Sequence, residues 1–149
     1  MDKAKVAFLV VLILLLYFLP AIIAQLKSGR AVLRLGNMTA KRDFIHTADF
    51  ARALVEAAAH YDGALPINVA YGEQYSIRDV ASMLCEISGY SGEIFWNINR
   101  PSGQNSREMS LDNLRQCVPK FRPRIDLNVG LTRTYRWFEE SYSSGTVRL

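Results

Sequence analysis

Two arginines, each next to a turn, are the residues of this sequence best suited to chemistry. Arg42 follows Lys41 and leads into an apolar stretch, and Arg100 opens a polar loop rich in turn-forming residues. A guanidinium group offers a planar fork of N–H donors that matches a phosphate. If both loops lie at the same edge of one lobe, they would clamp a diphosphate from two sides, each charged contact contributing roughly 1.5–3 kcal/mol.

The clamp has three supporting candidates and one simpler alternative. The side chains that could add a charge or a polar contact to it are Lys41, Asn37 and Gln104. Taken singly, however, each arginine is more often a solvated surface charge, and Arg42 has Asp43 beside it as an ion-pair partner. Both interpretations of Arg42 remain open at this point. The arginines at 107, 115, 122, 124, 133 and 136 are interpreted mainly as surface or connector charges.

The sequence lacks the patterns of a complete catalyst. Its nine glycines form no glycine-rich turn of the kind that holds a dinucleotide, and no Tyr is followed four residues later by Lys. No Ser occupies a nucleophile elbow, and the two Cys and two His residues match no metal-binding spacing. We therefore predict that this chain alone has no catalytic residues and binds neither a cofactor nor a metal.

The length and composition fit a chain of about one domain whose first residues are mostly apolar. Half of its 149 residues are hydrophobic, and the formal charge of +4 suits an anionic ligand or a membrane surface. No Lys/Arg stripe marks a nucleic-acid-binding protein. Residues 6–24 are uncharged and almost wholly apolar, with three interpretations: a membrane helix, a signal peptide, or an apolar anchor over 6–19 followed by an amphipathic helix that begins at Pro20. The third is preferred, although fourteen residues are short for a span.

Periodicity and turn residues predict short strands alternating with helices. Strands are expected at residues 31–35, 44–46, 66–70 and 93–98. Helices are expected at about 48–60, 77–88, 111–117 and 127–141, capped by Thr47, Ser76, Ser110 and Asp126. In the helix over 48–60, the face expected to point inward consists of Phe50, Leu54, Ala57 and Ala58. This order favours a small α/β lobe, and the strands are too few for a complete nucleotide-binding domain.

Six segments between about residues 19 and 142 resemble the C-terminal, substrate-binding part of the NAD-dependent epimerase/dehydratase family, extended short-chain dehydrogenase/reductases that act on nucleotide sugars. They lie at residues 20–29, 35–49, 67–78, 100–104, 121–127 and 130–138. The second holds an Arg-Asp-aromatic-x-His-x-x-Asp pattern over residues 42–49. Its Leu-Gly-Asn opening is most similar to GDP-mannose 4,6-dehydratase, whereas the last segments are more similar to GDP-fucose synthase-like members.

The resemblance implies specific roles for a few residues. In this family the Arg before the Asp-aromatic pair and the basic residue before Pro-x-Gly bind the substrate diphosphate, and these positions are Arg42 and Arg100 here. Asp43 and Asp49 become structural residues, one orienting Arg42 and the other starting a helix. The family's NAD(P) turn and its Tyr-x-x-x-Lys pair lie upstream of every matching segment, so a Rossmann domain is largely missing.

The resemblance also sets the expected organisation and function. We expect an apolar segment at 1–19, a substrate-binding lobe with short strands and about four helices at 20–142, and a tail at 143–149. The expected protein is a truncated family member that binds a nucleotide sugar, preferably a GDP-sugar. The alternatives are a membrane-tethered interaction domain and a remnant without ligand. We also expect a partner chain that supplies the cofactor domain. A membrane contact through residues 6–24 is expected as well, with a cytoplasmic or membrane-anchored location.

Overall fold

The computed structural model describes residues 19–29, 31–36, 39–99 and 104–144. Residues 19–27 are helical. The elements that follow are β1 (Val32–Leu35), β2 (Lys41–Asp43), α2 (Thr47–His60), β3 (Gln74–Ser76), α3 (Ile77–Ser88), β4 (Glu93–Trp96), α4 (Asp112–Cys117) and α5 (Leu127–Ser143). The strands are short and alternate with helices, which confirms the predicted α/β class.

The predicted membrane segment at 6–19 lies almost entirely outside these residues. Among the residues that the structure does describe, no helix combines the length and apolar character needed to cross a membrane. The predicted division of the chain at residues 19 and 142 stays a prediction.

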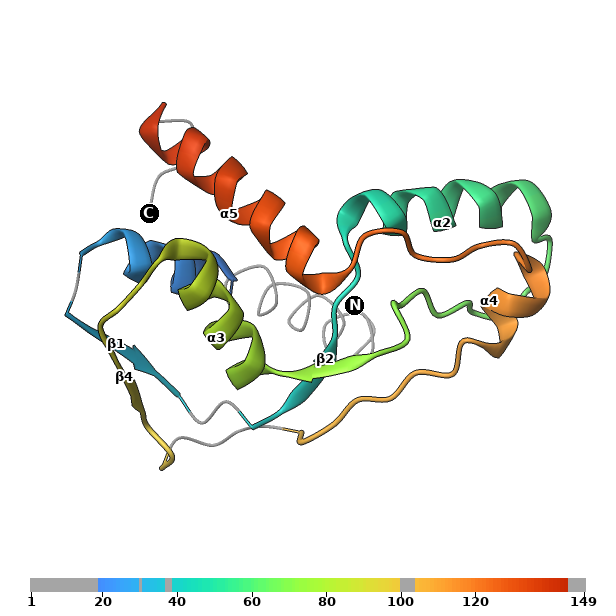
Figure 1. Ribbon diagram of the computed structural model, residues 1–149. Helices are drawn as coiled ribbons and strands as arrows, with labels where there is room; N and C mark the ends of the chain where they lie inside the picture. Colours follow the sequence, from blue (N-terminus) through green and yellow to red (C-terminus); the bar gives the residue numbers. More distant parts are fainter. Residues whose placement is uncertain (1–18, 30, 37–38, 100–103, 145–149) are drawn as a thin grey trace, which may run out of the picture.

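The strands form two separate pairs. β1 and β4 are parallel, with Val32 opposite Glu93 and Leu35 opposite Trp96. β2 and β3 are antiparallel, with Lys41 opposite Ser76 and Asp43 opposite Gln74. Figure 1 shows β1, β4, α3 and α5 at one end of the molecule, α2 and α4 at the other, and β2 between the two ends. The β2–β3 pair therefore joins two differently built halves.

Two strand predictions were wrong in position. The strand expected at 44–46 lies three residues earlier, at β2, and residues 66–70 belong to no strand. Instead, pairing begins at β3, after Gly72, which turns the chain at φ 101°. The carboxylate of Asp43 accepts hydrogen bonds from the backbone N–H groups of Tyr71 and Gly72, both at 2.7 Å. These bonds hold the turn against the end of β2, so pairing starts only beyond it.

The larger hydrophobic core lies in the half of the molecule that contains β1, β4, α3 and α5. α3 and α5 pack over β1 and residues 22–26, and the buried side chains come from all four segments: Ile22, Ile23, Leu26, Leu33, Leu35, Val80, Ala81, Leu84, Cys85, Leu127, Leu131, Tyr135 and Phe138. α3 begins with the predicted Ser76 cap, where Ser76 and Asp79 exchange hydrogen bonds with each other's backbone N–H, and it ends at Gly89 at φ 67°. The Ser76 cap of this helix was predicted.

The half that contains α2 and α4 has a smaller core, and its helices depart further from the sequence predictions. Its buried residues are Ala53, Leu114, Val118 and Phe121. The inward face predicted for α2 was wrong in part, because Phe50 and Leu54 are 40% and 49% exposed while Asp49 and Ala53 are buried. The cap is also one residue earlier: the ring Nδ1 of His46, and not Thr47, accepts the N–H of Ala48 at 3.2 Å. In the same half, α4 has Leu111 at its N-cap, one residue after the predicted Ser110.

Candidate functional site

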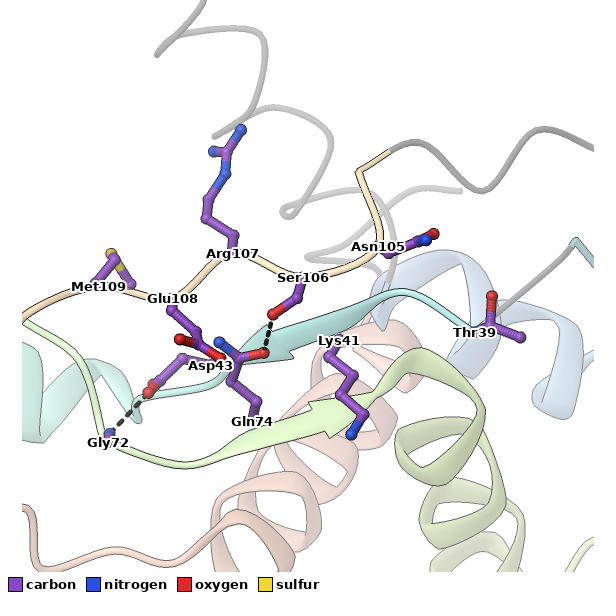
Figure 2. Close-up of a pocket in the computed structure, with 10 residues that line it drawn as sticks. All are labelled: Thr39, Lys41, Asp43, Gly72, Gln74, Asn105, Ser106, Arg107, Glu108 and Met109. Carbon is purple, nitrogen blue, oxygen red and sulfur yellow. Dashed lines mark hydrogen bonds between the residues drawn. The ribbon is translucent and has the colours of Figure 1, made fainter.

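A cavity of about 770 Å³ lies where β2, β3 and the segment over residues 104–109 meet. Its lining comes from β2, from the turn before β3, from β3 itself and from the returning loop: Thr39, Lys41, Asp43, Gly72, Gln74, Asn105, Ser106, Arg107, Glu108 and Met109. Figure 2 shows the loop passing over β2, with Ser106 directed toward Gln74 and Asp43 directed toward Gly72. Lys41 and Asp43, the neighbours of Arg42, therefore line a hollow, whereas Arg42 itself is not among the lining residues.

The loop is held to the strand pair by polar contacts. The N–H of Lys41 donates to the carbonyl of Asn105 at 2.7 Å. The hydroxyl of Ser106 donates to Oε1 of Gln74, also at 2.7 Å. Further along, Nδ2 of Asn68 donates to the carbonyl of Ser110 at 3.1 Å. Residues 105 and 106 are thus held against the β2–β3 pair. Arg100 itself and Asn37 lie outside the described residues.

Arg42 makes contacts different from the two predicted for it. Its Nη1 donates to the carbonyl of Lys41 at 2.6 Å and to that of Gln104 at 3.0 Å. Among the described residues no ion pair joins Arg42 to Asp43, because the Asp43 carboxylate accepts the N–H groups of residues 71 and 72. Asp43 is therefore structural, as the resemblance implied, but it orients the turn and not Arg42. The half-buried Arg42 ties β2 to the loop, four residues after Arg100.

The charges around the cavity are mixed. Lys41 and Arg107 are cations, and Asp43 and Glu108 are anions. Figure 2 shows the Arg107 side chain extending away from β2, whereas Lys41 extends to the other side of the strand. Nη2 of Arg107 lies 3.5 Å from Oε1 of Gln104, the supporting residue predicted from sequence. The interpretation of Arg107 as a surface or connector charge missed its place at the cavity. The available signal was its position three residues beyond Gln104 in the same loop.

Tyr75 is not suited to act as a base. It lies on β3 opposite Arg42, and its hydroxyl donates to Oε2 of Glu73 at 2.7 Å. This hydrogen bond to a carboxylate, with partial burial, raises the pKa of Tyr75 to about 12. The phenol therefore stays protonated at neutral pH and works as a donor.

The described residues do not fit a dinucleotide or a metal ion. A pyrophosphate needs a glycine turn and free N–H groups at a helix N-terminus. At the start of α3 the Ser76 hydroxyl and the Asp79 carboxylate already take the N–H groups, and at the start of α2 His46 caps the helix and the buried Asp49 places a carboxylate in the first turn. Within the described ranges, no group of three or more His, Cys, Asp or Glu side chains could hold a metal.

Sequence comparison relates the chain to one family. The profile of the NAD dependent epimerase/dehydratase family matches residues 17–77. Probable GDP-L-fucose synthase 1 of Oryza sativa subsp. japonica is 28% identical over 133 residues, which cover 86% of this chain and 40% of that protein. GDP-L-fucose synthase of Sinorhizobium fredii is 31% identical over 103 residues, covering 69% and 32%. The chain therefore spans well under half the length of these curated relatives, which agrees with the predicted resemblance to one part of the family.

Solved structures share the fold. The GDP-L-fucose synthetase from Naegleria fowleri bound to NADP matches with a TM-score of 0.75 at 22% identity, over 85% of this chain and 41% of that one. UDP-glucuronic acid 4-epimerase from Bacillus cereus, in complex with NAD, matches with a TM-score of 0.66 at 25% identity, over 82% and 38%. Both structural relatives hold a dinucleotide.

Proposed function

Because this chain belongs to the NAD-dependent epimerase/dehydratase family, we propose that it binds the diphosphate of a nucleoside diphosphate sugar and performs no catalysis by itself. The observation that carries the proposal is the hydrogen bond from Arg42 to the carbonyl of Gln104, at 3.0 Å. It supports the proposal because Gln104, four residues after Arg100 in the sequence, is held against the strand that carries Arg42.

The size and lining of the cavity support this ligand class. Ligand pockets usually enclose about 300–1,000 Å³, and the cavity of about 770 Å³ falls in that range. Lys41 supplies a positive charge on β2, and Arg107 supplies a second on the loop. Ser106 and Gln74 add polar groups that could orient a sugar. A diphosphate bound between Arg42 and Arg100 would therefore have room for its sugar alongside.

GDP-sugars are the favoured ligands. The relatives include GDP-L-fucose synthases of a plant and of a bacterium, proteins named for a GDP-linked sugar. The activity of those longer proteins is not proposed for this chain, since it has no Tyr-x-x-x-Lys pair and its described residues do not fit a dinucleotide. Binding without turnover is the function that remains.

Isothermal titration calorimetry tests the proposal directly. The full chain is titrated with GDP-mannose, UDP-glucose and inorganic diphosphate, after circular dichroism has shown that it is folded. We expect both nucleotide sugars to bind, GDP-mannose the more tightly, and inorganic diphosphate to compete with them. If a folded chain releases no heat at ligand concentrations of about 1 mM, corresponding to binding weaker than about −4 kcal/mol, the proposal is rejected.

One observation favours a second candidate function, an interaction domain that binds no nucleotide sugar. Large apolar side chains on α2 are exposed, among them Val55 at 71%. A chain that binds a protein but gives no heat with any nucleotide sugar would support this candidate over the first.

A further inference from the structure

The loop that covers the cavity runs along β2 in the same direction as the strand, as Figure 2 shows. Lys41, at the start of β2, donates its N–H to the carbonyl of Asn105 at 2.7 Å. The next loop residue, Ser106, bonds to Gln74, which pairs with Asp43 at the end of β2. The order of the loop residues thus follows the order of the strand residues. The cavity between them therefore has a Lys41 end and an Asp43 end.

These two ends carry opposite charges. The Lys41 end holds a cation and adjoins Arg42, whose Nη1 donates to the carbonyl of Gln104 at 3.0 Å. The Asp43 end holds two carboxylates, those of Asp43 and Glu108 (Figure 2). Under the proposed function, the diphosphate lies beside Arg42. A nucleotide sugar that extends along the cavity therefore places its sugar next to the carboxylates.

The two carboxylates differ in what they already bind. Both oxygens of Asp43 accept backbone N–H groups, those of Tyr71 and Gly72, each at 2.7 Å. In the part of the chain that the structure describes, the carboxylate of Glu108 makes no hydrogen bond and no ion pair. Figure 2 shows the Glu108 side chain pointing from the loop toward the β2–β3 pair, whereas Arg107 points the other way. A carboxylate with open acceptor positions thus faces the cavity.

The neighbours of Glu108 suit a hydroxylated ligand. Oε1 of Gln74 accepts the hydroxyl of Ser106 at 2.7 Å, so the amide group of Gln74 presents its Nε2 as a donor. Met109, in the cavity lining, adds an apolar and adaptable surface. A sugar offers hydroxyl groups that can donate to Glu108 and accept from Gln74, and it offers C–H groups that pack on Met109. This end of the cavity therefore matches a sugar in both its polar and its apolar groups.

The fold alone does not decide which sugars fit. The structural relatives include a GDP-L-fucose synthetase, named for a neutral sugar, and a UDP-glucuronic acid 4-epimerase, named for an acidic one. Selection between two such ligands often depends on a repulsive group as much as on an attractive one. An anionic side chain without a counter-charge is such a group, and Glu108 is one within the described residues.

We propose that Glu108 determines which sugar is bound: it accepts hydrogen bonds from the hydroxyl groups of a neutral sugar and repels a sugar that carries a carboxylate. The ligands of the cavity are therefore nucleoside diphosphate derivatives of neutral hexoses, and derivatives of uronic acids bind weakly. This inference rests on the proposed function and makes its ligand class narrower.

Calorimetry with UDP, UDP-glucose and UDP-glucuronate tests the selection. The three ligands share the base and the diphosphate, and the two sugars differ only at carbon 6, which is a hydroxymethyl group in one and a carboxylate in the other. We expect UDP-glucose to bind more tightly than UDP and about tenfold or more tightly than UDP-glucuronate, because two carboxylates in a partly enclosed site repel each other. Equal affinity for the two sugars would overturn the inference and leave the proposed function standing.

Two substitutions of glutamate assign the selection to one residue. Glu108→Gln keeps the size of the side chain and removes its charge, so the preference for UDP-glucose over UDP-glucuronate should fall by about fivefold or more. Glu140→Gln, at an exposed position on α5, is the matched control and should leave all three affinities within about twofold. Both positions are exposed, and urea denaturation checks that both variants are as stable as the unmodified chain. An unchanged preference in Glu108→Gln would contradict the assignment.

A substitution at the other end of the cavity tests the direction in which the ligand lies. Lys41→Gln should weaken the binding of all three ligands by a similar factor, because it removes a cation that faces their common diphosphate. If Glu108→Gln strengthens the binding of UDP as much as that of UDP-glucuronate, Glu108 faces the diphosphate and the inference is wrong. If none of the three ligands binds to the folded chain, the proposed function fails and the inference fails with it.

Discussion

The role of Arg42 depends on the backbone groups that its side chain contacts. Its guanidinium group donates from Nη1 to two carbonyls, those of Lys41 and Gln104. These bonds fix the side chain across the junction of strand and loop, which spares part of the entropy cost of ordering it for a ligand. Under the proposed function, Arg42 therefore both ties the loop to β2 and contacts the diphosphate.

Substituting Arg42 tests that double role. Arg42→Ala should weaken nucleotide-sugar binding about tenfold or more, because it removes a charge-assisted contact. Arg42→Lys keeps the charge but loses the planar fork, so its loss should be smaller. Arg115→Ala is the control, since that side chain is exposed on α4 and pairs with Asp112. Calorimetry measures all three, and unchanged affinity in Arg42→Ala would contradict the proposed role.

Asp49 is a buried carboxylate in the half of the molecule that contains α2 and α4. It is 2% exposed, and its carboxylate accepts Nη2 of Arg52 at 2.7 Å and the N–H groups of Arg124 and Ile125 at 2.8 and 2.9 Å. Burial opposes its ionisation, but the hydrogen bonds from Arg52 and the two N–H groups outweigh it and hold the pKa below its usual value of 3.8. The family resemblance implied a structural role for Asp49 at the start of α2. Its contacts with residues 124 and 125 were not predictable.

Asp49→Asn should destabilise the chain by roughly 3 kcal/mol at neutral pH, since the buried donors lose a charged acceptor. Because the pKa is lowered on folding, this stabilisation is complete above about pH 4 and is lost as the pH falls through the folded-state pKa. The unmodified chain should therefore lose stability in that acid range, and Asp49→Asn should lose less. Urea denaturation from neutral to acid pH measures both, with Asp112→Asn as an exposed control. Parallel pH profiles of Asp49→Asn and the unmodified chain would contradict the assignment.

At the scale of elements, local signals placed the helices well. Ser76 and Asp79 form the reciprocal cap that their spacing predicts, with both hydrogen bonds at 3.0 Å. Asp126 likewise accepts the N–H of Val129 at 2.9 Å at the start of α5. These two caps depend on neighbours within four residues, so the sequence predicted them, whereas the caps predicted for α2 and α4 were each one residue off. Short strands are different, because their bounds depend on a partner strand.

Ser76→Ala should cost about 1 kcal/mol of stability, because an N–H at the start of α3 loses its acceptor. Asp79→Ala should cost a similar amount, and the double substitution less than the sum, because the two side chains form one cap. Ser82→Ala, in the exposed middle of α3, is the matched control and should be neutral or slightly stabilising. Urea denaturation of the four variants gives the coupling. An additive result would mean that the two bonds act separately.

At the scale of the whole molecule, the two halves should differ in stability. The core around α3 and α5 contains large side chains that are fully buried, such as Leu33 and Leu84 at 0% exposure. The core between α2 and α4 is small. Helices with few buried apolar neighbours open locally without global unfolding. The half that contains α2 and α4 should therefore open more readily than the half that contains α3 and α5.

Hydrogen exchange of the chain alone measures this difference. Amides of α2 and α4 should exchange faster than those of α3. Leu114→Ala should speed exchange in α2 and α4 and leave α3 nearly unchanged, whereas Leu84→Ala should destabilise the whole chain by about 2–5 kcal/mol. If α2 is protected as strongly as α3, or if Leu114→Ala speeds exchange in all helices alike, the two halves form one cooperative unit.

The sequence by itself determined the α/β class, the helix positions, the caps of α3 and α5, and the likeness to one family. It also located the Arg42 segment as the place to look for an anion site. Each of these depends on residues close together along the chain, or on motifs in a fixed order.

Only the tertiary structure decided where the strands pair, what Asp43 and Arg42 bind, and which side of α2 is exposed. Asp43 bonds to residues 28 and 29 positions away, and Arg42 to one 62 positions away, distances at which no local pattern operates. The face of α2 was predicted inward because apolar side chains normally face a core. It lies outward because the rest of this chain, as described, offers too little apolar surface to cover it.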